Sequence, residues 1–329
     1  MILVMIIQVT PISFAGLKLN SKINLKSKGM LDCLLQFYSD EWSDWSYKVG
    51  YFIYYQDEEL GKNIPALCVE PSREGVGELG SYDTTIDVCN DNGIYTILYL
   101  YNNKKYTDWE LQNAEDYYLA AQTAMHCYAD KVKPKDRYRV GDRVLEGYTP
   151  NSLDEIKQRG KVVLNTAQSL YDSAIKNEYK QQDLKIGIEE RSNWKEEKIS
   201  GVKYYCKEYK IQSNYDLEFY KVDALGVSKN ISIFTSGNKK INNNGKIEYE
   251  NFKIAIPKDE FNYKTTIKGN IKVTAVSDKI PVAVYANSKS SNKQNYAVYT
   301  YEEQQASISK NMELAIDIDK LIINKLDFF

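Results

Sequence analysis

The sequence predicts an α+β protein, with an antiparallel β-sandwich or barrel and an inserted helical subdomain. Short runs rich in aromatic and β-branched residues, bounded by Gly, Asn, Asp and Pro, occupy the early and late parts of the chain. Between them lie two segments whose apolar residues recur every three or four positions. At 329 residues, the chain can bury a full-sized core without a disulfide or a structural metal.

The chain begins with an apolar run, MILVMIIQVTPISFAG, that has features of a secretory signal peptide. The small-x-small pattern Ser13-Phe14-Ala15 predicts cleavage after Ala15, so residues 1–15 would be a signal peptide, truncated in that it lacks a basic start. The run is too short to span a bilayer. The polar residues 16–29 are expected to be a mobile lead-in, with the folded part starting at residue 30.

Three early segments have the composition of strands: YKVGYFIYYQD (47–57), IPALCVE (64–70) and GIYTILYLYNN (93–103). From Lys198 onward, seven segments alternate polar with apolar residues, as in an antiparallel sandwich or barrel. The order predicts one α+β unit over 30–303, or an α/β first half followed by a separate sandwich. Residues 304–329 show neither a sorting motif nor an anchor helix, and are expected to be a tail or the start of a further domain.

Two helices are predicted in the middle of the chain. Thr107 and Glu110 form a capping-box pattern at the start of the first, and Ser152 and Glu155 do the same for the second. The first apolar stripe consists of Leu111, Ala114, Tyr118, Ala121, Met125 and Tyr128. The second consists of Leu153, Ile156, Val163, Leu164, Ala167, Leu170, Tyr171 and Ala174.

Composition narrows the class of partner. The net charge is -2 and no dense Lys/Arg block is present, which argues against nucleic-acid or anionic-membrane binding. The 28 tyrosines are typical of strands with one wet face and of surfaces that make amphipathic contacts. A protein, glycan or small-molecule partner is therefore expected.

Five cysteines occur, none in a CxxC or Cys/His pattern of zinc-binding spacing. In an exported protein this odd number leaves at least one sulfur outside any internal disulfide, and Cys68 is the candidate. The others, expected to be free buried thiols or disulfide partners, are Cys33, Cys89, Cys127 and Cys206.

Gln122 offers a reaction partner for the Cys68 thiol. It follows Tyr118 by one helical turn and precedes His126 by one turn, so its carboxamide is predicted at the edge of the apolar stripe. A thiolate could attack this carboxamide, release ammonia and leave an internal thioester, which survives only where water is excluded. We therefore expect the site to favour deprotonation of Cys68.

Two motifs resemble those of the thioester domains found in surface adhesins and pilus tip proteins of Gram-positive bacteria. LCVEP (67–71) resembles their Tyr-Cys-x-x-Pro signature, and AQTAMH (121–126) resembles their Thr-Gln-x-Ala-Ile-Trp signature. Ala121 and His126 replace the family's usual Thr or Ser and its Trp. The resemblance covers residues 30–303.

The resemblance implies that Cys68 is the thioester sulfur and Gln122 the acyl donor. It also implies a secreted or cell-surface adhesin that attaches covalently to a host surface protein, through a nucleophile such as a lysine amine. The acyl donor is consumed, so this is a single-use transfer and not an enzyme. No cofactor, nucleic-acid partner or membrane insertion after signal removal is implied, and the protein is expected to be monomeric.

Two other functions fit the sequence. One is a non-covalent glycan- or protein-binding sandwich, in which Cys68 is only a buried small side chain. The other is a transglutaminase or protease whose nucleophile, base and acid are Cys68, His126 and Asp130. His126, the single histidine, is expected to be a packed ring or a general base whose pKa of about 6.5 suits neutral pH.

Overall fold

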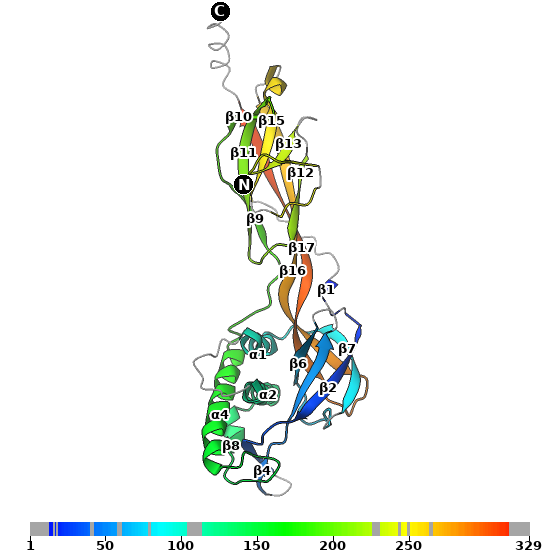
Figure 1. The fold of residues 1–329 in the computed structure, drawn as a ribbon, viewed down its shortest axis with the longest axis vertical. Coiled ribbons are helices and arrows are strands. Elements are labelled where there is room, and N and C mark those ends of the chain that lie inside the picture. Colours follow the sequence, from blue (N-terminus) through cyan, green and yellow to red (C-terminus); the bar gives the residue numbers. More distant parts are fainter. Residues whose placement is uncertain are drawn as a thin grey trace, which may run out of the picture. The chain divides into compact units, whose positions relative to one another are not determined.

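The computed structural model divides the chain into two compact units (Figure 1). The barrel unit comprises Ile12–Gln182 and Pro281–Glu302, and the sandwich unit comprises Met1–Pro11, Asp183–Ile280 and Glu303–Phe329. The residues that the structure describes are 13–15, 17, 19–39, 43–57, 61–77, 80–103, 114–225, 231–242, 245–248, 251–262 and 266–315.

Six strands form a closed barrel in the barrel unit. They are β2 (Lys22–Met30), β5 (Tyr51–Asp57), β6 (Lys62–Cys68), β7 (Ser81–Val88) and parts of β16 (Thr266–Ser288) and β17 (Tyr296–Ala315). Only residues 281–288 of β16 and 296–302 of β17 belong to the barrel unit, and the rest of both strands belongs to the sandwich unit. The order is β17-β6-β5-β2-β7-β16, and the barrel closes because β16 also pairs with β17. The short β1 (Ser13–Ala15) joins β17. The register between β2 and β5 shifts near Gly29, and such an irregularity helps a strand to bend. Gly29 has a φ of 134°, a backbone conformation that would be strained in a residue with a side chain.

Alternate residues of the barrel strands pack into two different cores. Ala66 and Cys68 of β6 belong to the apolar cluster formed with Leu25 and Val298, whereas Leu67 belongs to the cluster formed with the helices. This two-residue period places successive side chains on opposite faces of a strand. Cys68 is therefore carried on the last position of a strand that is buried on both faces.

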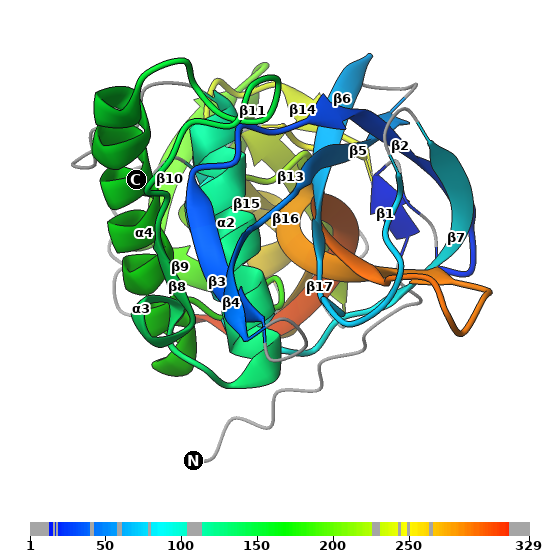
Figure 2. The same cartoon turned by 90° about the horizontal axis from the view of Figure 1, so that it is seen from below.

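The helices of the barrel unit are α1 (Asn92–Asn103), α2 (Ala114–Asp130), α3 (Pro134–Arg137) and α4 (Leu153–Ile175). A three-stranded sheet accompanies them, in the order β4 (Asp44–Tyr47), β3 (Leu35–Ser39) and β8 (Tyr138–Val140). Helix α2 contacts both α4 and β6, and lies between α4 and the barrel strands in Figure 2. This central position brings α2 to the end of β6.

The predicted strand over 93–103 is wrong, because these residues form α1. Asp91 Oδ1 accepts hydrogen bonds from the N–H groups of Gly93 and Ile94, at 2.8 and 3.0 Å, and so caps the helix. Residues on nearly every side of α1 are buried, so its apolar run lacks the one-sided period of a surface helix. Periodicity therefore could not separate it from a buried strand.

The two helices predicted in the middle of the chain are present. The cap of the second predicted helix is confirmed, since Ser152 accepts a hydrogen bond from the N–H of Glu155 at the start of α4. Helix α2 is confirmed from Ala114, whereas Thr107 and Glu110 lie outside the described residues.

The expected lead-in is also wrong in part, because residues 22–29 belong to β2 and pair with β5 and β7. Leu25 is fully buried in the barrel. The expected early strand over 47–57 is shorter, since β5 begins at Tyr51. The predicted strand over 64–70 corresponds to β6.

The sandwich unit packs two sheets around one apolar core. One sheet has the order β10-β11-β15-β13-β14, with β9 paired to β11, and β12 pairs with β16 in the other. The bounds are β9 (Ile186–Glu190), β10 (Lys195–Ile199), β11 (Val202–Ser213), β12 (Phe219–Leu225), β13 (Ser232–Thr235), β14 (Lys240–Ile241) and β15 (Asn251–Pro257), with a 3-10 turn η1 (Lys258–Asn262). Tyr209, Phe252 and Val273 are among its fully buried residues.

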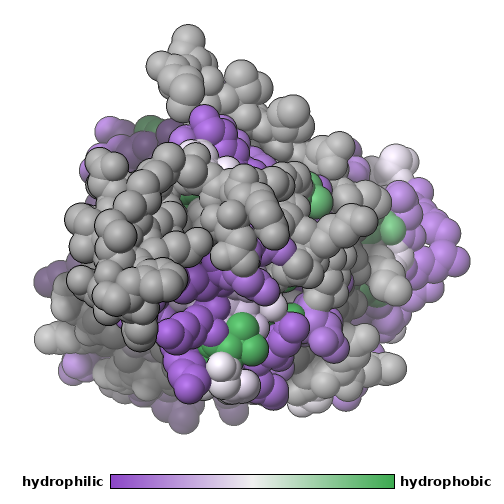
Figure 3. Space-filling model, turned by 90° about the horizontal axis from the view of Figure 1, so that it is seen from above, coloured by the Kyte–Doolittle hydropathy of each residue, from purple (hydrophilic) through white to green (hydrophobic). Residues whose placement is uncertain are grey.

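The α+β prediction of a sandwich and barrel with helices is confirmed. The sandwich is a separate unit, as in the second of the two alternatives for domain organisation. Residues 281–302, however, return to the barrel unit. Residues 304–315 continue β17 and are not a tail. Coloured residues on the face in Figure 3 are mostly hydrophilic, with small hydrophobic patches. Within the described ranges, no helix combines the length and apolar character needed to cross a membrane.

Candidate functional site

Cys68 ends strand β6 with its side chain buried, at 3% exposure. It lies opposite Tyr296 of β17 in the sheet register. Immediately after it, the N–H of Val69 donates to the carbonyl of Asn295, and the N–H of Glu70 donates to Cys68 Sγ at 3.3 Å. The sulfur is thus held at a fixed point where the strand turns away from the sheet.

The side chain of Gln122 on α2 forms two hydrogen bonds with the main chain of Cys68. Its Oε1 accepts a hydrogen bond from the Cys68 N–H at 2.9 Å, and its Nε2 donates to the Cys68 carbonyl at 3.0 Å. The side chain is buried, at 6% exposure. The structure therefore brings together the two residues that the motifs paired, although 54 positions separate them in the sequence.

Tyr118 completes the surroundings of the Gln122 oxygen. Its Oη lies 3.3 Å from Gln122 Oε1 and also donates to the carbonyl of Ala66 at 2.8 Å. The N–H of Ile53 donates to the same hydroxyl at 3.3 Å. Gln122 Oε1 consequently faces the N–H of Cys68 and the hydroxyl of Tyr118, whose single proton is shared with the carbonyl of Ala66. Such a pair can stabilise negative charge that develops on this oxygen.

A cavity of about 320 Å³ opens beside this pair. It is lined by Leu31, Lys48, Val49, Gly50, Tyr51, Ile53, Cys68, Glu74, Gly75, Val76, Gly77, Leu119, Gln122, His126, Gln294 and Tyr296. Most of this wall is apolar or main chain, and its titratable groups include Lys48, His126 and Glu74. A small reactant could therefore reach the pair through a largely apolar space.

The expectation that the site favours deprotonation of Cys68 is wrong. Burial raises the pKa of its thiol to about 12, because removing the thiolate from water outweighs the stabilising N–H of Glu70 and the charge of Lys48. The resting form at neutral pH is the thiol. Any attack on Gln122 therefore needs a group that takes the proton at the moment of reaction.

Lys48 is a site residue that the sequence did not single out. It lies between β4 and β5 at 7% exposure, and its Nζ donates to Thr123 Oγ1 at 3.0 Å. The same nitrogen lies 4.8 Å from the centre of the Tyr138 ring. Burial lowers the pKa of Lys48 to about 8, so a part of it is the neutral amine near neutral pH. Its local sequence, with aromatic residues on both sides, gave no sign that the amine would be buried.

His126 lines the cavity, on the same helix face as Gln122. Its Nε2 is buried and finds no hydrogen-bond partner among the described residues. Burial, together with the charges of Lys48 and Arg137, holds the pKa of His126 well below its usual value, so the expected pKa of about 6.5 is wrong. Asp130 forms an ion pair with Arg137. This arrangement does not support a Cys68, His126 and Asp130 triad.

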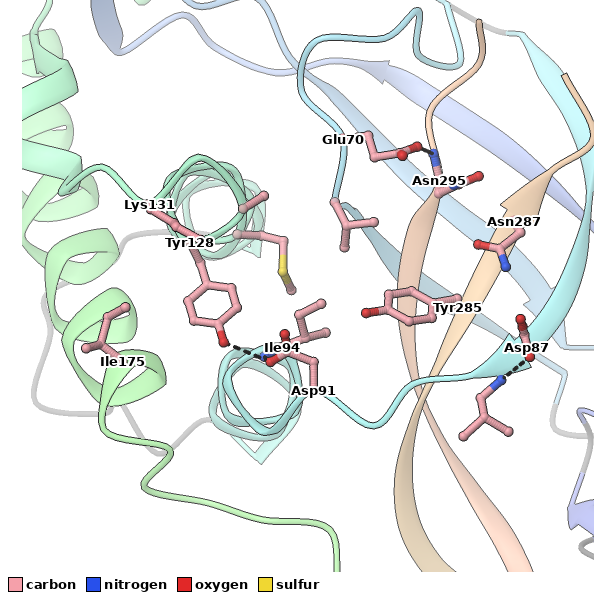
Figure 4. A pocket seen from close by; sticks show the side chains of 14 residues that line it. Glu70, Asp87, Asp91, Ile94, Tyr128, Lys131, Ile175, Tyr285, Asn287 and Asn295 are labelled. Atoms are coloured by element: carbon pink, nitrogen blue, oxygen red, sulfur yellow. Dashed lines mark hydrogen bonds between the residues drawn. The ribbon is translucent and has the colours of Figure 1, made fainter. Parts of the chain in front are cut away.

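The residues after Cys68 border a second, larger cavity of about 810 Å³ (Figure 4). Helices α1 and α2 form one side, where Tyr128 donates to Asp91 at 2.9 Å. Tyr285 of β16 and the side chain of Glu70 form part of the other side. The cavity thus offers aromatic and polar groups next to the loop that leaves Cys68.

All five cysteines are buried and free, which confirms the free-thiol alternative for Cys33, Cys89, Cys127 and Cys206. Among the residues with described placement, no three His, Cys, Asp or Glu side chains gather as metal ligands.

Solved structures share this architecture. The thioester domain of the Enterococcus faecium TIE86 protein matches with a TM-score of 0.66 and 14% identity, covering 95% of this chain and all of that one. The chain has the thioester-domain fold. The Bacillus anthracis TIE protein matches with a TM-score of 0.58 and 15% identity, over 90% of this thioester-fold chain and 49% of that protein. No family model and no curated protein matches the sequence.

Proposed function

We propose that Cys68 and Gln122 form an internal thioester, and that this bond attaches the protein covalently to an amine on a host surface protein. The contact between the Gln122 carboxamide and the main chain of Cys68 is the observation that supports this most directly. The likeness to thioester domains supports it through the fold. The protein would act as a secreted or cell-surface adhesin, without a cofactor and without turnover.

The proposed bond forms by attack of Cys68 Sγ on the side-chain carbonyl carbon of Gln122. Negative charge then develops on Oε1, where the N–H of Cys68 and the hydroxyl of Tyr118 can stabilise it. The carbon–nitrogen bond breaks and ammonia leaves. An incoming amine later attacks the same carbon, so that an amide forms at Gln122 and Cys68 becomes a thiol again.

Intact mass tests the first step. Freshly purified protein should be one ammonia lighter than its sequence, and Cys68→Ala and Gln122→Ala should each restore the full sequence-derived mass. Cys206→Ala is the matched control, because Cys206 is also a fully buried free thiol but lies in the sandwich unit. Full mass in the wild-type protein, without the mass gain of hydrolysis, would leave a non-covalent binding module as the better reading.

Methylamine tests the second step. Incubation should modify Gln122 and expose one newly alkylatable cysteine, Cys68, in equal amounts. Addition at other glutamines with turnover would instead indicate a transglutaminase. If crosslinked protein takes up no methylamine, the attachment to a host amine would be contradicted.

A further inference from the structure

Thioester formation, the proposed function on which this inference rests, requires two proton movements. The thiol of Cys68 must lose a proton, and its pKa of about 12 means that it does not do so unaided at neutral pH. The nitrogen of Gln122 must gain one, because an amide nitrogen leaves as ammonia and not as its anion. A single group in the cavity that first accepts and then returns a proton would meet both requirements.

Lys48 is the candidate for this group. It lines the same cavity as Cys68 and Gln122, and its Nζ donates to Thr123, the residue directly after Gln122 on α2. Within the described part of the chain, its Nζ is joined by no ion pair to a carboxylate. An ammonium buried without a counter-ion is unfavourable, so the surroundings ease its conversion to the neutral amine.

The other titratable groups at the cavity are less suited to this task. His126 has a pKa well below its ordinary value and is therefore a weak base. Glu74 forms an ion pair with Lys293 at 2.8 Å. The groups that surround Lys48 are Cys68 on β6, His126 and Cys127 on α2, Arg137 on α3 and Tyr138 on β8.

We propose that Lys48 carries the proton from the Cys68 thiol to the leaving nitrogen of Gln122. The neutral amine takes the Sγ proton as sulfur attacks the Gln122 carbon. The resulting ammonium gives a proton to Nε2 as the carbon–nitrogen bond breaks. Ammonia leaves, the thioester remains and Lys48 is again neutral, so no other reactant is needed.

The test measures how fast the crosslink forms in newly made protein. Wild-type protein, Lys48→Met and Lys48→Arg would be made by cell-free synthesis, sampled over time from pH 6 to 9, and read by intact mass after alkylation in denaturant. Lys62→Met is the matched control, an exposed lysine on the strand that carries Cys68. Far-ultraviolet circular dichroism would report whether each variant is folded.

We expect both Lys48 variants to form the crosslink at least about tenfold more slowly than wild type, the lower end of acid–base contributions, and Lys62→Met to match wild type. The wild-type rate should rise with pH and bend near pH 8, where Lys48 titrates. The residual reaction of the variants should lack this bend. Lys48→Arg keeps the positive charge but cannot accept a proton, so it separates proton transfer from charge alone.

Three results would overturn the assignment. Wild-type speed in Lys48→Arg would show that charge suffices, and an unchanged pH profile in either folded variant would exclude proton transfer by Lys48. A mass deficit with an alkylatable Cys68 would show that Lys48 itself had become the acyl acceptor. Full mass in wild type would instead refute the thioester and this role together. If Lys48→Met fails to fold, Lys48→Arg and the wild-type pH profile decide.

Discussion

Replacing Tyr118 by Phe removes one hydroxyl from the centre of the site and leaves the ring in place. The hydroxyl takes part in hydrogen bonds with Ile53, Ala66 and Gln122, at 3.3, 2.8 and 3.3 Å. The bonds to Ile53 and Ala66 tie α2 to β5 and β6. At about 0.5–1.5 kcal/mol for each, their loss should lower the free energy of unfolding by roughly 1–3 kcal/mol.

The same change should slow formation of the proposed crosslink. Loss of one donor to a developing oxyanion typically costs about 10²–10³ in rate. The Tyr118 hydroxyl is 3.3 Å from Gln122 Oε1 and is shared with Ala66, so we expect a smaller effect, roughly 10–100-fold. The N–H of Cys68 remains as the closer donor.

Two assays separate these effects. Urea unfolding gives the stability, and intact mass over time gives the rate of crosslinking. Tyr296→Phe is the matched control, because its buried hydroxyl also takes part in several hydrogen bonds, including those with Gln294 and Val76, but forms none with Gln122. The control should lose stability and keep the rate. Wild-type crosslinking in folded Tyr118→Phe would refute the role of this hydroxyl as an oxyanion donor.

Three other predictions follow from the same region. In Gln122→Ala, alkylation of Cys68 should rise about tenfold per pH unit from pH 8 to 10, because its thiol pKa is raised to about 12, and a plateau in this range would contradict that pKa. Below pH 6.5 His126 is protonated in the unfolded chain but not in the folded chain, so the free energy of unfolding should fall by up to about 1.4 kcal/mol per pH unit. His126→Gln should lack this pH-dependent loss. If both proteins lost stability equally with pH, a depressed pKa of His126 would be contradicted. Asp116→Ala removes the bidentate partner of the buried Arg159 but leaves its ion pairs with Asp32 and Glu155, so it should cost about 1.5–3 kcal/mol in urea unfolding. Glu155→Ala, at the exposed end of the same cluster, should cost below about 1 kcal/mol. Equal losses would show that burial of the Asp116–Arg159 pair is unimportant.

The pairing of Cys68 with Gln122 could be predicted from sequence because each stands in a short motif with a recognisable pattern. The position of helix α4 also followed from local rules, since its capping residue and its one-sided apolar stripe can be recognised in consecutive residues. Ser152 and α4 illustrate this. Local chemistry was enough for this helix, one face of which is buried and the other exposed to water.

Local rules failed for a helix that is buried on nearly every side. They also failed for a strand whose many polar residues obscured the alternation of buried and exposed positions. Helix α1 has buried residues around most of its circumference, so its pattern resembled that of a buried strand. Strand β2 is rich in Lys, Ser and Asn, which suggested a lead-in, yet Leu25 and Ser27 alternate into the barrel. The polar residues on the exposed face of β2 outnumber its buried apolar ones, so its composition resembled that of a linker.

The burial of Lys48 could not be predicted because it depends on elements far apart in the sequence. Its neighbours include Thr123 and Tyr138, and only the folded chain brings them around the amine. The raised pKa of Cys68 has the same origin. The motifs indicated which two side chains lie together, and the surroundings created by folding determine the protonation state of the Cys68 thiol.

The loss of stability caused by burying Lys48 supports a chemical role for this side chain. Lowering the pKa of Lys48 from 10.5 to about 8 corresponds to roughly 3 kcal/mol against the charged form near neutral pH, a sizeable part of the stability of an ordinary domain. An apolar side chain at this position would avoid that penalty. The thiol of Cys68 with its raised pKa and the buried, unpartnered Nε2 of His126 border the same cavity in the described structure. Features that lower stability are thus gathered around Cys68 and Gln122, and this supports the proposed proton transfer in a site from which water is excluded.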